Sequence, residues 1–199
     1  GKVEETTVLV ARTGVEIVPR FKAEAMETAF ENFRLLSEVM KQKMKFGHHY
    51  GKFPGWQKDQ LLEPGASLVM NGFGLYADPI RVDRTEDEEG HFRYNIVVYL
   101  RPLGANANVV VAAGVGNAST REIKYAYRWL PEDEVPKEVV VADLKSKQAG
   151  SRTLYRVANE DPGDLENTIE KMAMKRAEID AVNHLPGVSE LFPPPEKKG

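Results

Sequence analysis

The segment from residue 78 to residue 130 constrains the fold most, because it reads as one β-strand after another with no helix between them. Val, Ile and Tyr are frequent in four stretches that turn residues separate. The stretches are "DPIRVDR" (78–84), "HFRYNIVVYLRP" (91–102), "NVVVAAGVGN" (108–117) and "EIKYAYRWL" (122–130). The acidic "RTEDEEG" (84–90) predicts an exposed hairpin tip, and "LGANAN" (103–108) predicts the next turn. Short connections between consecutive strands predict an antiparallel β-meander.

Helical patterns flank this middle region. From Phe21 to Phe46 apolar residues recur at three- and four-residue steps, with lysines in the last turns. Pro64 is placed to open a shorter helix, and a long final helix is expected between a cap at Asp164 and a stop at Pro186-Gly187. Residues 1–20 predict a short strand, whereas 131–163 fit either a strand or a short helix. The fold class is therefore α+β: an antiparallel β-meander packed by a long C-terminal helix, with an N-terminal amphipathic helix.

The final helix carries a charge on its apolar face. At 100° per residue, one stripe holds Leu165, Ile169, Met172 and Ile179, and Arg176 projects from the middle of it. A charge there costs free energy unless it is paired, reaches water or meets a ligand. Asp180, four residues later, is one available partner, and a nucleic-acid phosphate is another.

Composition limits the class of protein. The 199 residues, 42% apolar and 29% charged, predict one globular domain over 1–190 and a flexible Pro-rich tail over 191–199. No apolar run has the length of a membrane span and no signal-peptide pattern opens the chain, so we expect a cytoplasmic protein with no membrane partner. The chain has no cysteine, which excludes disulfides and thiol chemistry. A net charge of −3 argues against a uniformly basic surface but leaves room for a local basic track.

The segment from Lys41 to Lys58, "KQKMKFGHHYGKFPGWQK", combines lysines and histidines with aromatic residues and has no acid. Cations that follow phosphates and rings that stack on unpaired bases are the mixture that holds single-stranded nucleic acid. A structural interpretation is also open, in which the lysines compensate a helix C-terminus and the aromatics anchor the loop. The candidate residues here are Lys41, Lys43, Lys45, His49, Tyr50, Lys52, Phe53, Trp56 and Lys58.

Two further groups of cations belong to the hypothesis. In "TREIKYAYRW" a strand would place aromatic residues on one face and cations on the other, although an ordinary half-buried strand explains the same pattern. The candidates are Arg121, Lys124 and Arg128 from this stretch, and Lys175 and Arg176 from the final helix.

Signatures of catalysis are missing. No Gly-rich loop is followed by Lys-Ser or Lys-Thr, and the lone "GVGN" (114–117) favours a bulge or turn over a phosphate site. The histidines lack metal-ligand spacing. We therefore expect no enzymatic activity, no cofactor and no metal.

Three stretches together resemble a known group of proteins. "YGKFPGWQKDQLLEPGASLVMNGFGLY", "GVGNASTREIKYAYR" and "NTIEKMAMKRAEIDAV" are similar in layout to the phage and prokaryotic single-strand DNA annealing proteins of the Rad-fifty-two, Erf and Sak type, over about residues 47–190. The matching features are the glycines Gly114 and Gly116, the pair Lys175 and Arg176, and Gly187. The sequence departs from that pattern in having no cysteine in 131–163 and in ending the helix with "AVNHLPG".

The resemblance implies a β-β-β-α core that assembles into a ring or filament of identical subunits, with a basic groove running along it. It implies ATP-independent binding and annealing of single-stranded DNA in recombination and repair, in a phage-infected or prokaryotic cell. It also allows a single-strand binding protein or an exonuclease as a partner. Alternatives are a plain single-strand binder or recombination mediator, an oligomeric structural or assembly protein with no nucleic-acid role, and, more distantly, a metal-dependent nuclease.

Overall fold

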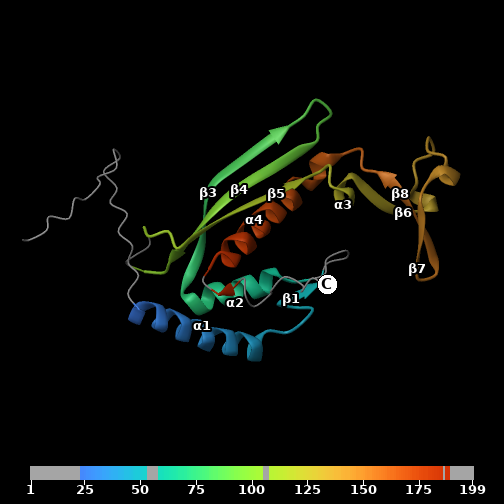
Figure 1. Cartoon of the computed structure of the whole chain (residues 1–199). Coiled ribbons are helices and arrows are strands. Elements are labelled where there is room, and N and C mark those ends of the chain that lie inside the picture. Colours follow the sequence, from blue (N-terminus) through green and yellow to red (C-terminus); the bar gives the residue numbers. More distant parts are fainter. Residues whose placement is uncertain (1–22, 53–57, 105–107, 186, 189–199) are drawn as a thin grey trace, which may run out of the picture.

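The structure, a computed structural model, describes residues 23–52, 58–104, 108–185 and 187–188 (Figure 1). Within them the protein is α+β with a long C-terminal helix, as predicted, and its strands form three antiparallel sheets. The strand predicted for 1–20 and the tail 191–199 lie outside the described residues.

The N-terminal part holds two helices and a small hairpin. Helix α1 (Ala23–Lys43) has Lys41 and Lys43 in its last turn, and it buries Met40 in the core. Strands β1 (Tyr50–Lys52) and β2 (Asp59–Leu61) pair antiparallel. Helix α2 (Glu63–Phe73) follows with a proline in its first turn and ends at a left-handed Gly74 (φ 63°). Both predicted helices are therefore confirmed.

The first three of the four strands predicted for the meander form the central sheet, in the order β3-β4-β5: β3 (Leu75–Glu86), β4 (Phe92–Pro102) and β5 (Ala112–Ser119). The fourth predicted strand does not join this sheet. Alternate residues of β4 are buried on one face, among them Ile96, Val98 and Leu100. This period-2 burial is what one covered sheet face requires, and the covering element is the final helix.

Helix α4 (Glu166–Asn183) lies along this sheet (Figure 1), with a row of alanines against β5. A Cβ added to Gly116 would lie 2.1 Å from the carbonyl oxygen of Ala173, and one added to Gly114 would lie 2.3 Å from that of Ala177. The interpretation of "GVGN" as a bulge or turn is wrong, because β5 pairs with β4 in continuous register through both glycines. The glycines instead let the helix backbone approach the strand.

The deeply buried stripe of α4 differs from the one that the sequence predicts. Ile169, Ala173, Ala177 and Ala181 are completely buried, whereas Met172, Arg176 and Ile179 are only partly buried, at the edge of that stripe. The prediction gave more weight to large apolar residues, but glycines on the facing strand select small ones. Arg176 therefore lies beside the core and not inside it.

Another three-stranded sheet follows the central sheet in the chain. Strands β6 (Tyr127–Pro131), β8 (Arg152–Ala158) and β7 (Ser146–Ala149) pair in the order β6-β8-β7, so the undecided region 131–163 contains two strands. Between β6 and β7 the chain forms the 3-10 turns η1 (Glu132–Glu134) and η2 (Val141–Asp143).

Two local predictions are wrong. The stretch 122–130 is not one strand, because the short helix α3 (Ile123–Ala126) precedes β6. The carboxylate of Glu122 accepts a hydrogen bond from the Ser119 amide (3.1 Å), which starts a turn that side-chain periodicity does not reveal. Asp164 does not cap α4 either, since it lies within the 3-10 turn η3 (Pro162–Leu165), where Asp161 accepts from the Gly163 amide.

Candidate functional site

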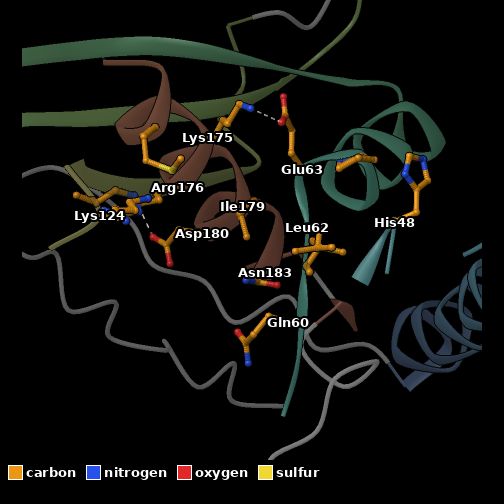
Figure 2. Close-up of a pocket in the computed structure, with 14 residues that line it drawn as sticks. His48, Gln60, Leu62, Glu63, Lys124, Lys175, Arg176, Ile179, Asp180 and Asn183 are labelled. Atoms are coloured by element: carbon orange, nitrogen blue, oxygen red, sulfur yellow. Dashed lines mark hydrogen bonds and ion pairs between the residues drawn. The ribbon is translucent and has the colours of Figure 1, made fainter. Parts of the chain in front are cut away.

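A groove of about 790 Å³ lies between α4 and residues 60–64, which join β2 to the first turn of α2 (Figure 2). Its cationic side chains are Lys124, Lys175 and Arg176, and its acids are Glu63 and Asp180. Its apolar surface comes from residues of β2, α2, β5 and α4: Leu61, Leu62, Pro64, Val115, Met172 and Ile179. His48, Gln60 and Asn183 complete the lining. The groove thus combines apolar and charged side chains, and its cations outnumber its acids.

The histidine side of the groove is held by close backbone packing. The amide of Leu62 donates to the carbonyl oxygen of His49 (2.9 Å), and a Cβ added to Gly65 would lie 2.1 Å from that same oxygen. Only glycine therefore lets the first turn of α2 lie against this loop. His49 turns its Nδ1 inward to accept from the Lys45 amide (2.9 Å). Burial lowers the pKa of His49, and the neighbouring His48 and Lys45 add to this effect.

Lys175 crosses the groove to reach Glu63, with Nζ 2.6 Å from a carboxylate oxygen (Figure 2). The two side chains are 43% and 51% exposed. An ion pair so open to water contributes about 0–1 kcal/mol, so exchanging Glu63 for another anion costs little. Lys124 is held still more loosely, with its Nζ 3.9 Å from Glu122.

Arg176 is held firmly. Its Nη1 and Nη2 donate to the two carboxylate oxygens of Glu122 (2.7 and 2.8 Å), and Nη1 also donates to the carbonyl oxygen of Asn117 (2.6 Å). The hydrogen bonds from Arg176 lower the pKa of Glu122, and Glu122 in turn raises the pKa of Arg176. Such a bidentate pair fixes both side chains. Arg176 therefore has a partner within the chain, and that partner is Glu122 and not Asp180.

Arg176 also belongs to a polar row along α4. Residues 176, 180 and 184 follow one another at one-turn steps, and each meets a backbone group of β5. Asp180 accepts from the Val115 amide (2.9 Å), and a ring nitrogen of His184 lies 2.9 Å from the Ala113 carbonyl oxygen. Because β5 is an edge strand, its outward backbone groups would otherwise need water or another strand. The row therefore closes this edge of the sheet.

The predicted site residues are only partly brought together. The groove collects Lys124, Lys175 and Arg176, together with His48, which the sequence analysis did not select. Arg128 lies in a neighbouring hollow of about 450 Å³, which Lys124 also lines. Phe53 and Trp56 lie outside the described residues. The remaining predicted residues do not line either hollow: Lys41, Lys43, Lys45, His49, Tyr50, Lys52, Lys58 and Arg121.

Arg121 forms its ion pairs away from the groove. Its guanidinium binds Asp87 (2.6 Å) and Glu89 (2.9 Å) in the acidic tip between β3 and β4. The acidic run is therefore not merely a solvated tip, because it forms ion pairs with the end of β5. Tyr50 places its ring edge-on to Phe46, with 5.7 Å between ring centroids. Whether these residues contact nucleic acid stays a prediction.

The residues that the sequence analysis missed are mainly polar side chains that have no chemical signature alone. His48 is adjacent to a selected residue, and Gln60 and Asn183 reach the groove only through the tertiary fold. Their composition and spacing give no signal.

Comparisons of the chain with protein-family models, with curated proteins and with solved structures gave no match. In the part of the chain that the structure describes, no helix is both long and apolar enough to span a membrane.

Proposed function

We propose that this protein binds single-stranded DNA in the groove beside α4 and anneals complementary strands without nucleotide hydrolysis. The observation that carries the proposal is the groove itself, which apolar side chains line together with Lys124 and Lys175 from distant parts of the chain. Unpaired bases need an apolar surface and phosphates need cations, and a single strand presents both along its length.

The two lysines suit a reversible contact. Lys175 is paired with an exposed Glu63, and Lys124 lies 3.9 Å from Glu122, so a phosphate can replace either carboxylate at small cost. Arg176 has a different part in the proposal. Its bond to Glu122 positions α3 and the adjacent Lys124 beside the groove.

Annealing requires that the bound strand leave its pairing edges accessible. A groove that holds one strand by its phosphates and by the faces of its bases, and leaves the pairing edges open to a second strand, meets this requirement without an ATPase. We propose further that identical subunits assemble into a ring or filament that continues the groove. A single-strand binding protein or an exonuclease is a suitable partner for such an assembly.

The test is fluorescence anisotropy of a labelled oligonucleotide, single-stranded and then duplexed, at several salt concentrations. We expect tighter binding of the single strand. K124Q/K175Q should weaken binding and make its salt dependence shallower by about 0.7 per lost contact. Lys171 is an exposed lysine one turn before Lys175 that does not line the groove, so K171Q is the matched control. Wild-type affinity in K124Q/K175Q, or no binding at low salt, would contradict the proposal.

Annealing is measured separately from binding. Complementary oligonucleotides, one bearing a donor and the other an acceptor dye, should pair faster with the protein and without ATP. Tight binding with no acceleration would leave a plain single-strand binder and remove the annealing step from the proposal.

A further inference from the structure

The sheet of β6, β8 and β7 carries positively charged side chains and no negatively charged ones on its strands. Strands β6, β7 and β8 read YRWLP, SKQA and RTLYRVA, with four cations and no acid. The cations are Arg128, Lys147, Arg152 and Arg156. None of them forms an ion pair with another residue in the part of the chain that the structure describes, although the chain as a whole has a net charge of −3. Acids lie near two of the cations, since Arg152 lines a hollow with Glu132 and Asp133 and Arg128 lines one with Asp164, whereas no acid lines a hollow with Lys147 or Arg156 among those described.

One face of the sheet joins two of these cations to exposed aromatic rings. Tyr127 and Trp129 alternate along β6 and are each 37% exposed. The guanidinium of Arg156 lies 3.8 Å from the centroid of the Tyr127 ring, and the Nζ of Lys147 lies 4.3 Å from the ring of Trp129. These contacts require the four side chains to share a face across three strands. We call these four residues the aromatic–cationic face.

This face does not serve the core. The opposite face of β8 buries Val157 at 2% exposure, which is how the sheet contributes to packing. Tyr127 and Trp129 stay more than one third exposed, so each still offers ring surface to a ligand, and the charged groups that contact these rings are cations and not acids. Rings oriented in this way are ready for a flat ligand that carries negative charge beside it.

The face is also continuous with the groove. Lys124 lines the groove beside α4 and also the neighbouring hollow, which Tyr127, Arg128 and Trp129 border. Its Nζ lies 4.4 Å from the ring centroid of Tyr125, another residue of that hollow. A strand lying in the groove can therefore pass Lys124 and reach β6.

We propose that the aromatic–cationic face binds unpaired nucleobases of single-stranded nucleic acid, as a site distinct from the groove. A base stacks on Trp129 or Tyr127, and Lys147 and Arg156 turn from the rings to the flanking phosphates. The proposal shares its ligand with the proposed function but depends on other residues, so the two can fail separately.

The chain has two tryptophans, so W56F leaves Trp129 as the only one. Titration of W56F with oligo-deoxythymidylate should quench the Trp129 fluorescence, and K147Q/R156Q in the same background should shift the quenching to higher oligonucleotide concentration. Because one stacked base is worth on the order of 5- to 150-fold in affinity, W129A should bind that much more weakly in the anisotropy assay. Tyr76 on β3 is also 37% exposed, and Y76A is the matched control with unchanged affinity.

The outcomes separate the two proposals. Unquenched Trp129 together with wild-type affinity in W129A overturns the aromatic–cationic face, even if K124Q/K175Q binds weakly and the groove stands. Quenched Trp129 and weak binding by W129A, with K124Q/K175Q unaffected, uphold the face and overturn the groove. If W129A fails to fold, the quenching in W56F decides alone, because that variant retains Trp129.

Discussion

Gly116 should be the position on β5 where the smallest added atom does the most damage. A Cβ there would lie 2.1 Å from the Ala173 carbonyl oxygen and 2.3 Å from the Ala177 amide nitrogen. Both atoms belong to the backbone of α4, so no side-chain rotation relieves the overlap. For ordinary contact, at 3.4 Å or more, the helix must move away from the strand by about 1 Å.

The loss of stability in G116A follows from the packing contacts that this movement of α4 breaks. Ala173, Ala177 and Ile169 are completely buried against the sheet, and they lose contact atoms when the helix shifts. Overpacking of a core costs about 1–3 kcal/mol, and a clash with backbone on a rigid helix belongs at the upper end. For a chain of this size, 3 kcal/mol corresponds to a fall in Tm of roughly 6–12 °C.

The assay is urea unfolding followed by circular dichroism, with the free energy taken from the midpoint and slope. Gly72 in α2 is the matched control, because a Cβ there meets nothing within 4 Å. G72A should stabilise by about 0.5–1 kcal/mol, since alanine is the better helix former. If the free energy of unfolding of G116A is within about 0.5 kcal/mol of wild type, α4 does not lie close enough to β5 for a Cβ at position 116 to meet its backbone.

Three further predictions concern titratable groups. Burial raises the pKa of Glu178, so its charge opposes folding above that pKa, and E178Q should unfold at higher urea than wild type at pH 7 but not at pH 4. Burial lowers the pKa of His49, whose Nδ1 accepts from the Lys45 amide. The stability that neutral His49 contributes is present above pH 6.5 and should be lost as the pH falls through the lowered pKa. In urea unfolding at pH 5 to 8, H49Q should lose this pH dependence. E122Q should lower the free energy of unfolding by about 1–2 kcal/mol. The loss is smaller than the roughly 3–5 kcal/mol of a fully buried ion pair, because the Glu122 and Arg176 side chains are 28% and 38% exposed. The double variant R176Q/E122Q should recover part of this loss in the same assay. Arg176 holds the pKa of Glu122 below the ordinary 4.5. The difference in unfolding free energy between wild type and E122Q should therefore disappear as the pH falls through the lowered pKa of Glu122.

Much of the fold could be predicted because the signals are local. Period-2 patterns fix the strands of the meander, and three- and four-residue steps fix α1 and α4. The short helix α3 was missed because it depends on the Glu122 carboxylate and not on periodicity. The buried stripe of α4 was missed for a related reason: the two glycines of β5 decide which face of α4 is buried.

The candidate site was less predictable, because residue type does not reveal pairing. Arg121, Lys175 and Arg176 are equal in sequence as cations, yet each meets a different acid from a distant segment. The number of hydrogen bonds in each pair and the exposure of its acid separate a lysine that can exchange its partner from an arginine that cannot do so cheaply. Single-sequence patterns contain neither quantity.

Arg176 shows how one side chain can satisfy a structural requirement and support a binding surface. Its stripe position would be costly in a fully covered helix, but here it lies where the sheet ends, and the Asn117 carbonyl oxygen at that edge needs a donor. The same guanidinium holds Glu122, which precedes α3 and so determines where Lys124 enters the groove. Loss of Arg176 should therefore weaken binding through Lys124 and through stability together, whereas loss of Lys175 should act on binding alone. If R176Q lost affinity with no change in unfolding free energy, its role would be direct contact with the ligand.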